Sequence, residues 1–379
     1  MSKRTKKNDV TRLIVAASEN DPDMLYATRF FAPDAFIFLE ERGKRTLVLS
    51  DLEIDRARKQ AEADEFVSYS TLEREVQGNQ RMAPAYEKVL SHFLRKRGVS
   101  SAVVPANFQL GFAEELAASN IKLRTTNGLF WPEREAKTDA ELKMMRRALQ
   151  ITEAGMARAM EVLKASKPGA GKKLMWRGKT LTSEVLRAEI DSAILRAGGL
   201  PANTIVAGGD QACDPHERGS GPLKANSLII IDIFPRDAKS GYFGDMTRTV
   251  VRGRASDEQR RLWETVREGQ ELALRKMKPG VDGLNLHNEV KQLFTDRGFP
   301  TEVRGGKQVG FFHGTGHGLG LEIHEFPRFQ KTVFKVGQVL TVEPGLYYPG
   351  LGGVRIEDVA VVTKSGNRLL SRFEKRLEV

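Results

Sequence analysis

Short apolar runs alternate with amphipathic segments along the N-terminal third of the chain. Four of these runs predict β-strands, and they are residues 13–16, 36–39, 46–49 and 102–104. A turn at residues 41–44, between the second and third runs, favours a β-hairpin. Residues 52–63 and 83–97 have the polar and apolar spacing of helices. The pattern predicts a compact α/β domain over residues 1–131, with a boundary near Pro132.

The remaining segment, residues 132–379, begins with a sequence that is typical of a helix N-terminus. Thr138-x-x-Glu141 has the form of a capping box at a helix N-terminus. Three further helices are predicted, and they carry Leu186, Ile190 and Ile194 before Gly198, start at Ser256-x-x-Gln259, and span residues 284–297. Strand-like runs lie between these helices. The sequence therefore predicts an α+β second domain, with a mostly antiparallel sheet covered by helices.

Five acidic and imidazole residues of this second domain stand in strongly apolar or glycine-rich surroundings. They are Asp232, Asp245, His317, Glu343 and Glu357. A buried carboxylate is destabilising unless a cation or strong hydrogen-bond donors compensate it. Four carboxylates and one imidazole in such surroundings indicate a divalent metal site. Oxygen-rich ligation with one imidazole suits Mn, Fe, Co or Zn.

Asp232 lies within an apolar run, residues 228–234, and a turn-rich segment separates it from Asp245. A hairpin formed by these two strands would bring both carboxylates within reach of one cation or of a pair. By period-two alternation, Arg355 shares a strand face with Glu357. Arg355 either holds an acidic ligand through a hydrogen bond or forms a surface salt bridge.

Histidines are concentrated around residue 317, because three of the six in the chain are His313, His317 and His324. The glycines on both sides of His317 let the backbone approach a crowded site. This cluster favours a functional role over a structural one. His92 and His287, which lie apart in predicted helices, are interpreted as structural.

Composition restricts the remaining possibilities. The formal net charge is +11, and solvated basic faces plus a basic arm at residues 2–7 are favoured over nucleic-acid binding. The single cysteine, Cys213, excludes an internal disulfide and fits a reducing cytoplasm. No apolar run is long enough to span a membrane, and no signal-peptide core follows the basic N-terminus.

The second domain, from about residue 134 to 379, resembles the pita-bread metallopeptidases, the superfamily of methionyl aminopeptidase, aminopeptidase P and prolidase. All five ligand types occur in the family's order, with His317 in a His-Gly-Thr-x-His-x-x-Gly block, Glu343 in Val-Glu-Pro-Gly and Glu357 in Arg-Ile-Glu-Asp. The positions of His313 and His324 match the Xaa-Pro branch. The first domain looks like the creatinase-type N-terminal domain, which also favours that branch.

The resemblance implies a dinuclear-metal peptidase that hydrolyses Xaa-Pro bonds at peptide N-termini through a metal-bridging hydroxide. Its two divalent ions would be manganese in the first instance, with Co, Zn or Fe as alternatives. Asp232 would bind one ion, His317 and Glu343 the other, and Asp245 and Glu357 both. The partner would be a peptide with proline at its second position, and the enzyme would be a cytoplasmic homodimer with no membrane association.

The resemblance also assigns roles around the metals. Glu343 would carry the proton from the attacking water to the leaving amine. His216 and His324 would donate hydrogen bonds to the oxyanion or to the substrate backbone, and His313 would line the substrate pocket, where Arg355 is a further binding residue. Two features depart from the family pattern: twelve residues separate Asp232 from Asp245, two more than usual, and the surroundings of His216 are atypical. An even insertion preserves the strand face, so an intact site with a longer turn is expected.

Three alternatives remain. The first is a metal-dependent aminopeptidase of other specificity, since the sequence defines the metal ligands better than the pocket. The second is metal-free hydrolysis of the creatinase type. The third is a non-catalytic pita-bread binding module. Relatives of the last two kinds lose acidic ligands, and the complete set here argues against both. Cleavage of dipeptides alone and cleavage of longer peptides are both compatible with the sequence.

Overall fold

The structure is a computed structural model that describes residues 10–379, so the basic arm at residues 2–7 lies outside the described residues. The chain divides into two compact units. One extends to Pro132, and the other is Glu133–Val379. The boundary predicted from the sequence, between residues 131 and 132, lies one residue before this division.

The first unit is a mixed six-stranded sheet between two groups of helices. The strands, in the order β4-β3-β2-β1-β5-β6, are β1 Arg12–Ala16, β2 Phe36–Glu41, β3 Lys44–Leu49, β4 Glu65–Ser68, β5 Ser101–Val104 and β6 Lys122–Thr125. The helices are α1 Pro22–Thr28, α2 Ile54–Gln60, α3 Tyr69–Gln77, α4 Tyr86–Lys96 and α5 Leu110–Ala118. Leu13 and Val15 pack against α3, α4 and α5, while Ile14 packs against α1 and α2. The predicted 36–49 hairpin is present, whereas α2 and α4 are shorter than predicted.

The second unit contains four long helices and a set of antiparallel sheets. The helices are α6 Asp139–Ala165, α7 Ser183–Arg196, α8 Asp257–Lys276 and α9 Gly283–Asp296. The main strands are β11 Ile205–Gly208, β12 Leu228–Ile233, β14 Met246–Val251, β17 His317–Gly318, β18 Glu325–Arg328, β19 Val339–Val342, β20 Gly345–Tyr348, β21 Gly352–Arg355, β22 Asp358–Val362 and β23 Asn367–Leu369. Shorter strands are β7 Lys167–Pro168, β8 Leu174–Trp176, β9 Lys179–Thr180, β10 Gly199–Leu200, β13 Arg236–Asp237, β15 Glu302–Arg304 and β16 Lys307–Val309.

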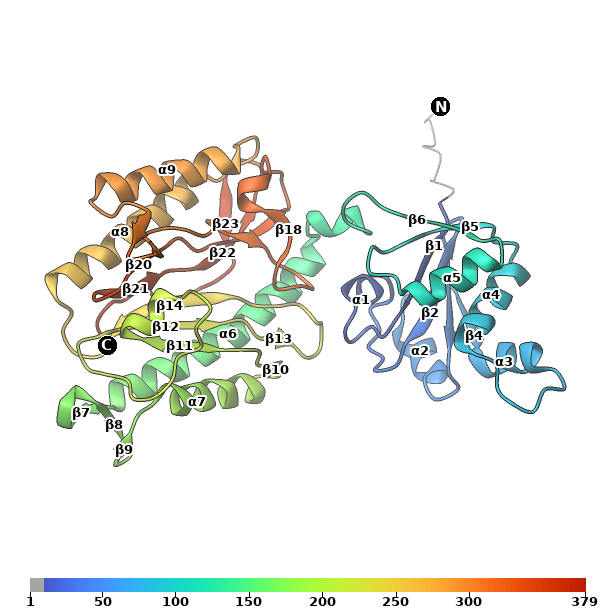
Figure 1. The fold of residues 1–379 in the computed structure, drawn as a ribbon, viewed down its shortest axis with the longest axis horizontal. Helices are drawn as coiled ribbons and strands as arrows, with labels where there is room; N and C mark the ends of the chain where they lie inside the picture. Colours follow the sequence, from blue (N-terminus) through green and yellow to red (C-terminus); the bar gives the residue numbers. More distant parts are fainter. Residues whose placement is uncertain (1–9) are drawn as a thin grey trace. The chain divides into compact units, whose positions relative to one another are not determined.

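Two sheets form the centre of this unit, and each is covered by one pair of helices. Helices α6 and α7 pack against the sheet β11-β12-β14, and helices α8 and α9 pack against the sheet β18-β17-β19-β22-β23 and the hairpin β20-β21. Figure 1 shows the strands layered between the two helix pairs. All strand pairs of these sheets are antiparallel in the part of the chain that the structure describes, as predicted.

Local sequence signals explain where the long helices begin. The side chains of Thr138 and Ser256 each accept a hydrogen bond from the backbone N–H of the third helical residue. The side chains of Glu141 and Gln259 in turn accept from the backbone N–H of Thr138 and Ser256, so both predicted capping boxes are present. Asp282 caps α9. After α7, Gly198 takes a φ of +88°, which favours glycine and ends the helix.

The two additional residues between Asp232 and Asp245 are accommodated in the loop from β12 to β14. The antiparallel register pairs Asp232 with Thr247, two residues after Asp245. Asp245 therefore shares a sheet face with Asp232, as the even insertion predicts. Within the loop, buried Asp237 accepts hydrogen bonds from Ser240 Oγ at 2.6 Å and from the backbone of Lys239 at 3.3 Å, which orders the turn.

Candidate metal centre

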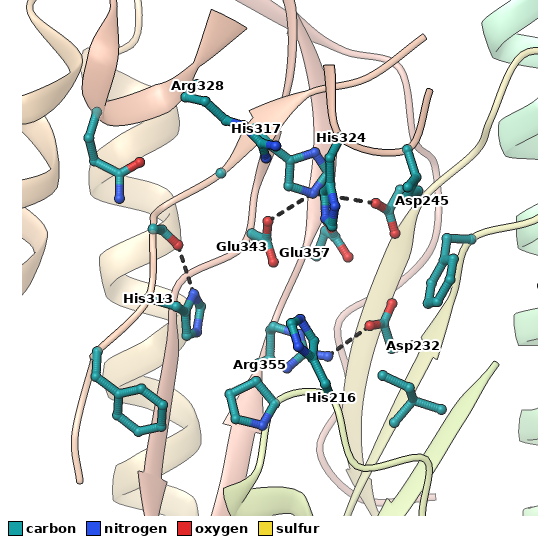
Figure 2. Close-up of a pocket in the computed structure, with 18 of the residues that line it drawn as sticks. His216, Asp232, Asp245, His313, His317, His324, Arg328, Glu343, Arg355 and Glu357 are labelled. Carbon is teal, nitrogen blue, oxygen red and sulfur yellow. Dashed lines mark hydrogen bonds and ion pairs between the residues drawn. The ribbon is translucent and has the colours of Figure 1, made fainter. Parts of the chain in front are cut away.

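The five predicted ligands converge on one cavity of about 860 Å³ in the second unit. Asp232 comes from β12, Asp245 from the residue before β14, His317 from β17, Glu343 from the residue after β19 and Glu357 from the link between β21 and β22. Figure 2 shows the two aspartates on one side of the cavity and His317 and Glu343 on the other. The ligands therefore come from both central sheets.

His317 presents one ring nitrogen to the carboxylates. Its Nδ1 donates to the carbonyl oxygen of Gly318 at 3.1 Å, so Nε2 is directed into the cavity. Nε2 lies 3.2 Å from Glu343 Oε1 and 3.8 Å from Asp245 Oδ2. A Cβ atom on the preceding Gly316 would lie 2.0 Å from the carbonyl oxygen of Thr341, so only glycine fits there.

Glu357 completes a group of potential ligand atoms. One atom each of Asp245, His317 and Glu357 lie within 4.8 Å of one another, and all three residues are buried. Thr247 Oγ1 donates to Glu357 Oε2 at 2.8 Å, and the backbone N–H of Glu357 donates to Thr247 O at 3.1 Å. Asp245 thus lies directly before β14, and the threonine that orients Glu357 follows two residues later on that strand.

The electrostatics of the cavity favour a cation. Burial, and then repulsion between the carboxylates, raises the pKa of Asp245 and of Glu357 well above the ordinary range. Asp232 Oδ1 is buried and has no hydrogen-bond partner among residues 10–379. Clustered buried carboxylates with an unpartnered oxygen fit divalent metal ions, and their oxygen-rich composition with one imidazole suits a hard or borderline cation.

Arg355 holds the other oxygen of Asp232. Its Nη2 lies 2.8 Å from Asp232 Oδ2, and only 4% of Arg355 is exposed, so it is not a surface salt bridge. Its Nη1 donates to the hydroxyl of Tyr347 at 3.0 Å, and this hydroxyl lies 2.8 Å from His313 Nε2. Since His313 Nδ1 donates to Gly314 O and burial lowers the His313 pKa to about 4, Nε2 of the neutral ring accepts from Tyr347.

Tyr347 was not predicted from the sequence. It is fully buried on β20, one residue before Tyr348, and nothing in the sequence separates the two tyrosines. Its position becomes apparent only when β20 and β21 pair, because Tyr347 and Arg355 lie on the same two-stranded hairpin.

The remaining predicted histidines line the same cavity. His324 stands perpendicular to His317, with ring centroids 4.4 Å apart, and burial followed by the charge of His317 lowers its pKa to about 4. His216 lies on the loop after β11, is exposed, and reaches toward the cavity in Figure 2. By contrast, His287 lies outside the cavity lining, with its Nδ1 2.9 Å from Thr315 Oγ1.

A buried group of charges lies beneath His324. The Glu325 side chain is 2% exposed; its Oε2 lies 2.8 Å from Arg134 Nη2, and its Oε1 forms an ion pair with Lys137. Residues alternate between the two faces along β18, so Glu325 points inward while Arg328, and His324 directly before the strand, line the cavity. A Cβ atom on Gly320 would lie 2.4 Å from Glu325 Oε1, so the loop packs tightly around this carboxylate.

Known proteins are similar to this chain in sequence and in fold. The model of the family described as metallopeptidase family M24 matches residues 143–364, which include all five candidate ligands. An Xaa-Pro dipeptidase of Pyrococcus horikoshii is 30% identical over 298 residues, covering 77% of this chain and 79% of that protein. The structure of an Xaa-Pro dipeptidase from Bacillus anthracis has a TM-score of 0.80 at 25% identity and covers 97% of this chain and 95% of that one. An X-Pro aminopeptidase from Thermotoga maritima MSB8 has a TM-score of 0.81 at 22% identity, with coverage of 98% and 97%.

Proposed function

Because the chain belongs to metallopeptidase family M24, we propose that it is an enzyme that hydrolyses the Xaa-Pro bond at the N-terminus of a peptide. Its second unit has the pita-bread fold of that family. The observation that carries the proposal is the buried cluster of Asp245, His317 and Glu357 within the cavity that also holds Asp232 and Glu343. The Xaa-Pro dipeptidase name of the P. horikoshii relative supports the specificity.

Two divalent ions, with manganese as the first choice, would be held by Asp232, Asp245, His317, Glu343 and Glu357. Bound there, they would acidify a water molecule and polarise the scissile carbonyl group. Asp245 and Glu357 are the proposed shared ligands. This assignment agrees with the central position of Glu357 between the aspartates and Glu343 in Figure 2.

Glu343 is the proposed proton carrier. Its side chain is 17% exposed, against 12% for Asp232 and 6% for Asp245, so it has better access to water and substrate than either aspartate. It takes a proton from the attacking water and delivers it to the leaving amine. Neutral His324 donates an N–H to the oxygen that becomes negative, and His216 donates to the same oxygen or to the substrate backbone.

The apolar part of the cavity wall suits a proline ring. Ile205, Phe234, Phe312 and Ile323 line the cavity together with His313. The hydrogen bonds from Tyr347 and to Gly314 fix the plane of the His313 ring, so its face gives a rigid apolar wall. This arrangement supports recognition of a compact ring next to the scissile bond.

A positively charged side chain at the cavity wall favours short substrates. Arg328 lines the cavity and forms no salt bridge within the described part of the chain. The carboxylate at the end of an Xaa-Pro dipeptide would give this guanidinium a charged partner. We therefore place dipeptide cleavage ahead of aminopeptidase activity on longer peptides, which is the second candidate function.

The test is release of the N-terminal residue from Xaa-Pro dipeptides and from Xaa-Pro tripeptides by chelator-stripped protein with Mn²⁺ added back. We expect dipeptide cleavage, with a raised KM in Arg328→Gln. Arg297→Gln, a surface arginine paired with Glu268, is the matched control and leaves KM unchanged. Tripeptide cleavage with equal efficiency would identify an aminopeptidase, and no cleavage of either class would discard the proline specificity.

The assembly and location are proposals of the same kind. We propose a cytoplasmic homodimer, which light scattering after size-exclusion chromatography and cell fractionation would test. Within residues 10–379, no helix has the length and apolar character needed to cross a membrane.

A further inference from the structure

Gln270 is a polar residue buried in the apolar core between α8 and the strands of the metal centre. It is 0% exposed. Its Nε2 donates to the carbonyl oxygen of Val342 at 2.8 Å and to that of Ile356 at 3.1 Å. These two residues immediately precede Glu343 and Glu357. One side-chain amide therefore joins the backbone at the two positions from which two of the candidate metal ligands extend.

The two carbonyl groups lie where neighbouring strands separate. Strands β19 and β22 are paired up to Val342 opposite Asp358. Beyond that point the backbone N–H of Glu343 donates to Thr315 O at 2.8 Å, whereas that of Glu357 donates to Thr247 O at 3.1 Å. Each glutamate is thus tied to a different neighbouring segment. The amide of Gln270 is the cross-link at the end of the shared ladder, where the sheet itself no longer holds the two chains together.

The orientation of the Gln270 amide follows from its partners. Two carbonyl oxygens require a donor, so Nε2 faces them, and a flipped amide would place Oε1 against both. In this orientation Oε1 is buried without a partner among the described residues. An unpartnered buried acceptor is destabilising, and a methionine of similar length would not have one. The cost to stability indicates that the donor side of the amide has a specific role.

We propose that Gln270 is a positioning residue, which sets the separation of the Glu343 and Glu357 carboxylates and thereby the affinity for the metal pair. The inference rests on the proposed function, because it takes both glutamates as metal ligands. Gln270 acts through the backbone carbonyls of the preceding residues. Its effect therefore falls on metal binding first and on hydrolysis as a consequence.

The test compares Gln270→Met with Gln338→Met. Gln338 is the matched control, since it is also 0% exposed and lies next to the opposite end of β19, where its Nε2 donates to Glu135 Oε1 at 2.7 Å. Calorimetric titration of the chelator-stripped proteins with Mn²⁺ gives affinity and stoichiometry. We expect Gln270→Met to bind Mn²⁺ about 10 to 100-fold more weakly, the range seen when groups that orient metal ligands are removed. Gln338→Met should retain the parent affinity.

Electron paramagnetic resonance supplies a readout that general destabilisation would not change. A correctly spaced Mn²⁺ pair is spin-coupled, and Gln270→Met should lose that coupling at saturating metal while the control keeps it. Parent-like affinity and coupling in Gln270→Met would overturn the proposal, as would equal losses in both variants. If Gln270→Met does not fold, the same measurements are made on Gln270→Glu, because this variant retains the shape of the side chain and replaces the donor nitrogen by oxygen.

The outcome separates this proposal from the proposed function. A parent chain that binds a coupled Mn²⁺ pair but cleaves no Xaa-Pro peptide would refute the peptidase assignment and leave the Gln270 test intact. A parent chain that binds no metal pair would refute both. In the metal-free proteins, faster hydrogen exchange at the amides of Glu343 and Glu357 in Gln270→Met than in Gln338→Met is expected, and equal exchange would count against the proposal.

Discussion

Arg355 Nη2 lies 2.8 Å from Asp232 Oδ2, while the second oxygen of the same carboxylate, Oδ1, is buried without a partner in the described part of the chain. The guanidinium thus fixes the plane of Asp232 and leaves one oxygen available to a cation. The same arginine also donates to Tyr347, and its Nε lies 3.3 Å from Thr247 Oγ1. A single side chain therefore connects one proposed ligand with the threonine that orients another.

Arg355→Lys should impair the metal centre although it preserves charge. A lysine ammonium cannot reproduce the planar fork that contacts Asp232, Tyr347 and Thr247 together. We expect kcat/KM to fall by about 10 to 100-fold, with a higher Mn²⁺ concentration needed for half-maximal activity. Arg146→Lys, in an ion pair with Glu153 outside the cavity, is the control. If Arg355→Lys needs no more Mn²⁺ than the parent protein, Arg355 does not contribute to the metal centre.

Asp245→Asn should release both metal ions, because Asp245 is a proposed ligand of each and an amide is a weaker ligand than a carboxylate. Elemental analysis after dialysis would measure the loss. Asp237→Asn changes another buried aspartate of the same loop, whose hydrogen bonds serve the turn. It should lower stability and retain the metal. Full metal content and activity in Asp245→Asn would refute the bridging assignment.

Metal removal should lower the melting temperature. A ligand at about 100 times its dissociation constant stabilises the folded chain by about 2.7 kcal/mol. Differential scanning calorimetry with and without chelator would measure the loss. An unchanged melting temperature on chelation would show that no metal stabilises the fold.

The effect of chelation should grow with pH. Folding raises the pKa values of Asp245 and Glu357 above their ordinary 3.8 and 4.5, so the metal-free fold is penalised above those values and increasingly as pH rises. The pKa of His317 is raised from 6.5 to about 9, so its stabilising contribution is complete below 6.5 and is lost as pH approaches 9. The pKa of Glu343 is lowered to about 2, so its contribution to stability does not change between about pH 5.5 and pH 8. The difference in melting temperature between the metal-loaded and the chelated protein should therefore be larger at about pH 8 than at about pH 5.5. A larger difference at about pH 5.5 would contradict these pKa shifts.

Glu325→Gln should be strongly destabilising. It leaves Lys137 buried without its anionic partner and removes one of the two carboxylates bound to Arg134. Breaking a buried ion pair from one side costs about 3–5 kcal/mol. Urea unfolding would measure this change, and kcat should fall as well, because His324 is the adjacent residue. The double variant with Lys137→Met should recover part of the loss.

The control for Glu325→Gln is Lys335→Met, which removes an exposed ion pair with Glu135 and should change stability by less than about 1 kcal/mol. Additive effects of Glu325→Gln and Lys137→Met would show that the two charges are not coupled.

The features that the sequence predicted best are those that local rules determine. The capping boxes at Thr138 and Ser256 need only the identity of residues three positions apart. The common face of Asp232 and Asp245 follows from the even number of inserted residues, because side chains alternate along strands. The five candidate ligands were selected because charged residues in apolar or glycine-rich surroundings require compensation.

The features that were missed depend on the partner that tertiary packing supplies. Gln270 lies within an amphipathic helix, where a glutamine is an ordinary residue. Glu325 directly follows His324, the residue to which the sequence assigned a function, and nothing in its local pattern marks it as buried. In the first unit, α3 follows directly on β4, so no loop separates the helix from the strand, although Tyr69, Leu72 and Val76 form a short apolar stripe. Burial and neighbours, rather than residue type, identify these positions.

The distribution of the ligands over both central sheets has a consequence for biosynthesis. The proposed ligands are spread over residues 232–357, so Asp232 is made long before Glu357. As the chain leaves the ribosome, the early carboxylates emerge without their later partners, and only pairing between distant segments encloses the ion. The complete set of proposed ligands is therefore available only after these segments have paired, and a chain interrupted before Glu357 would lack one of the two residues proposed to bind both ions.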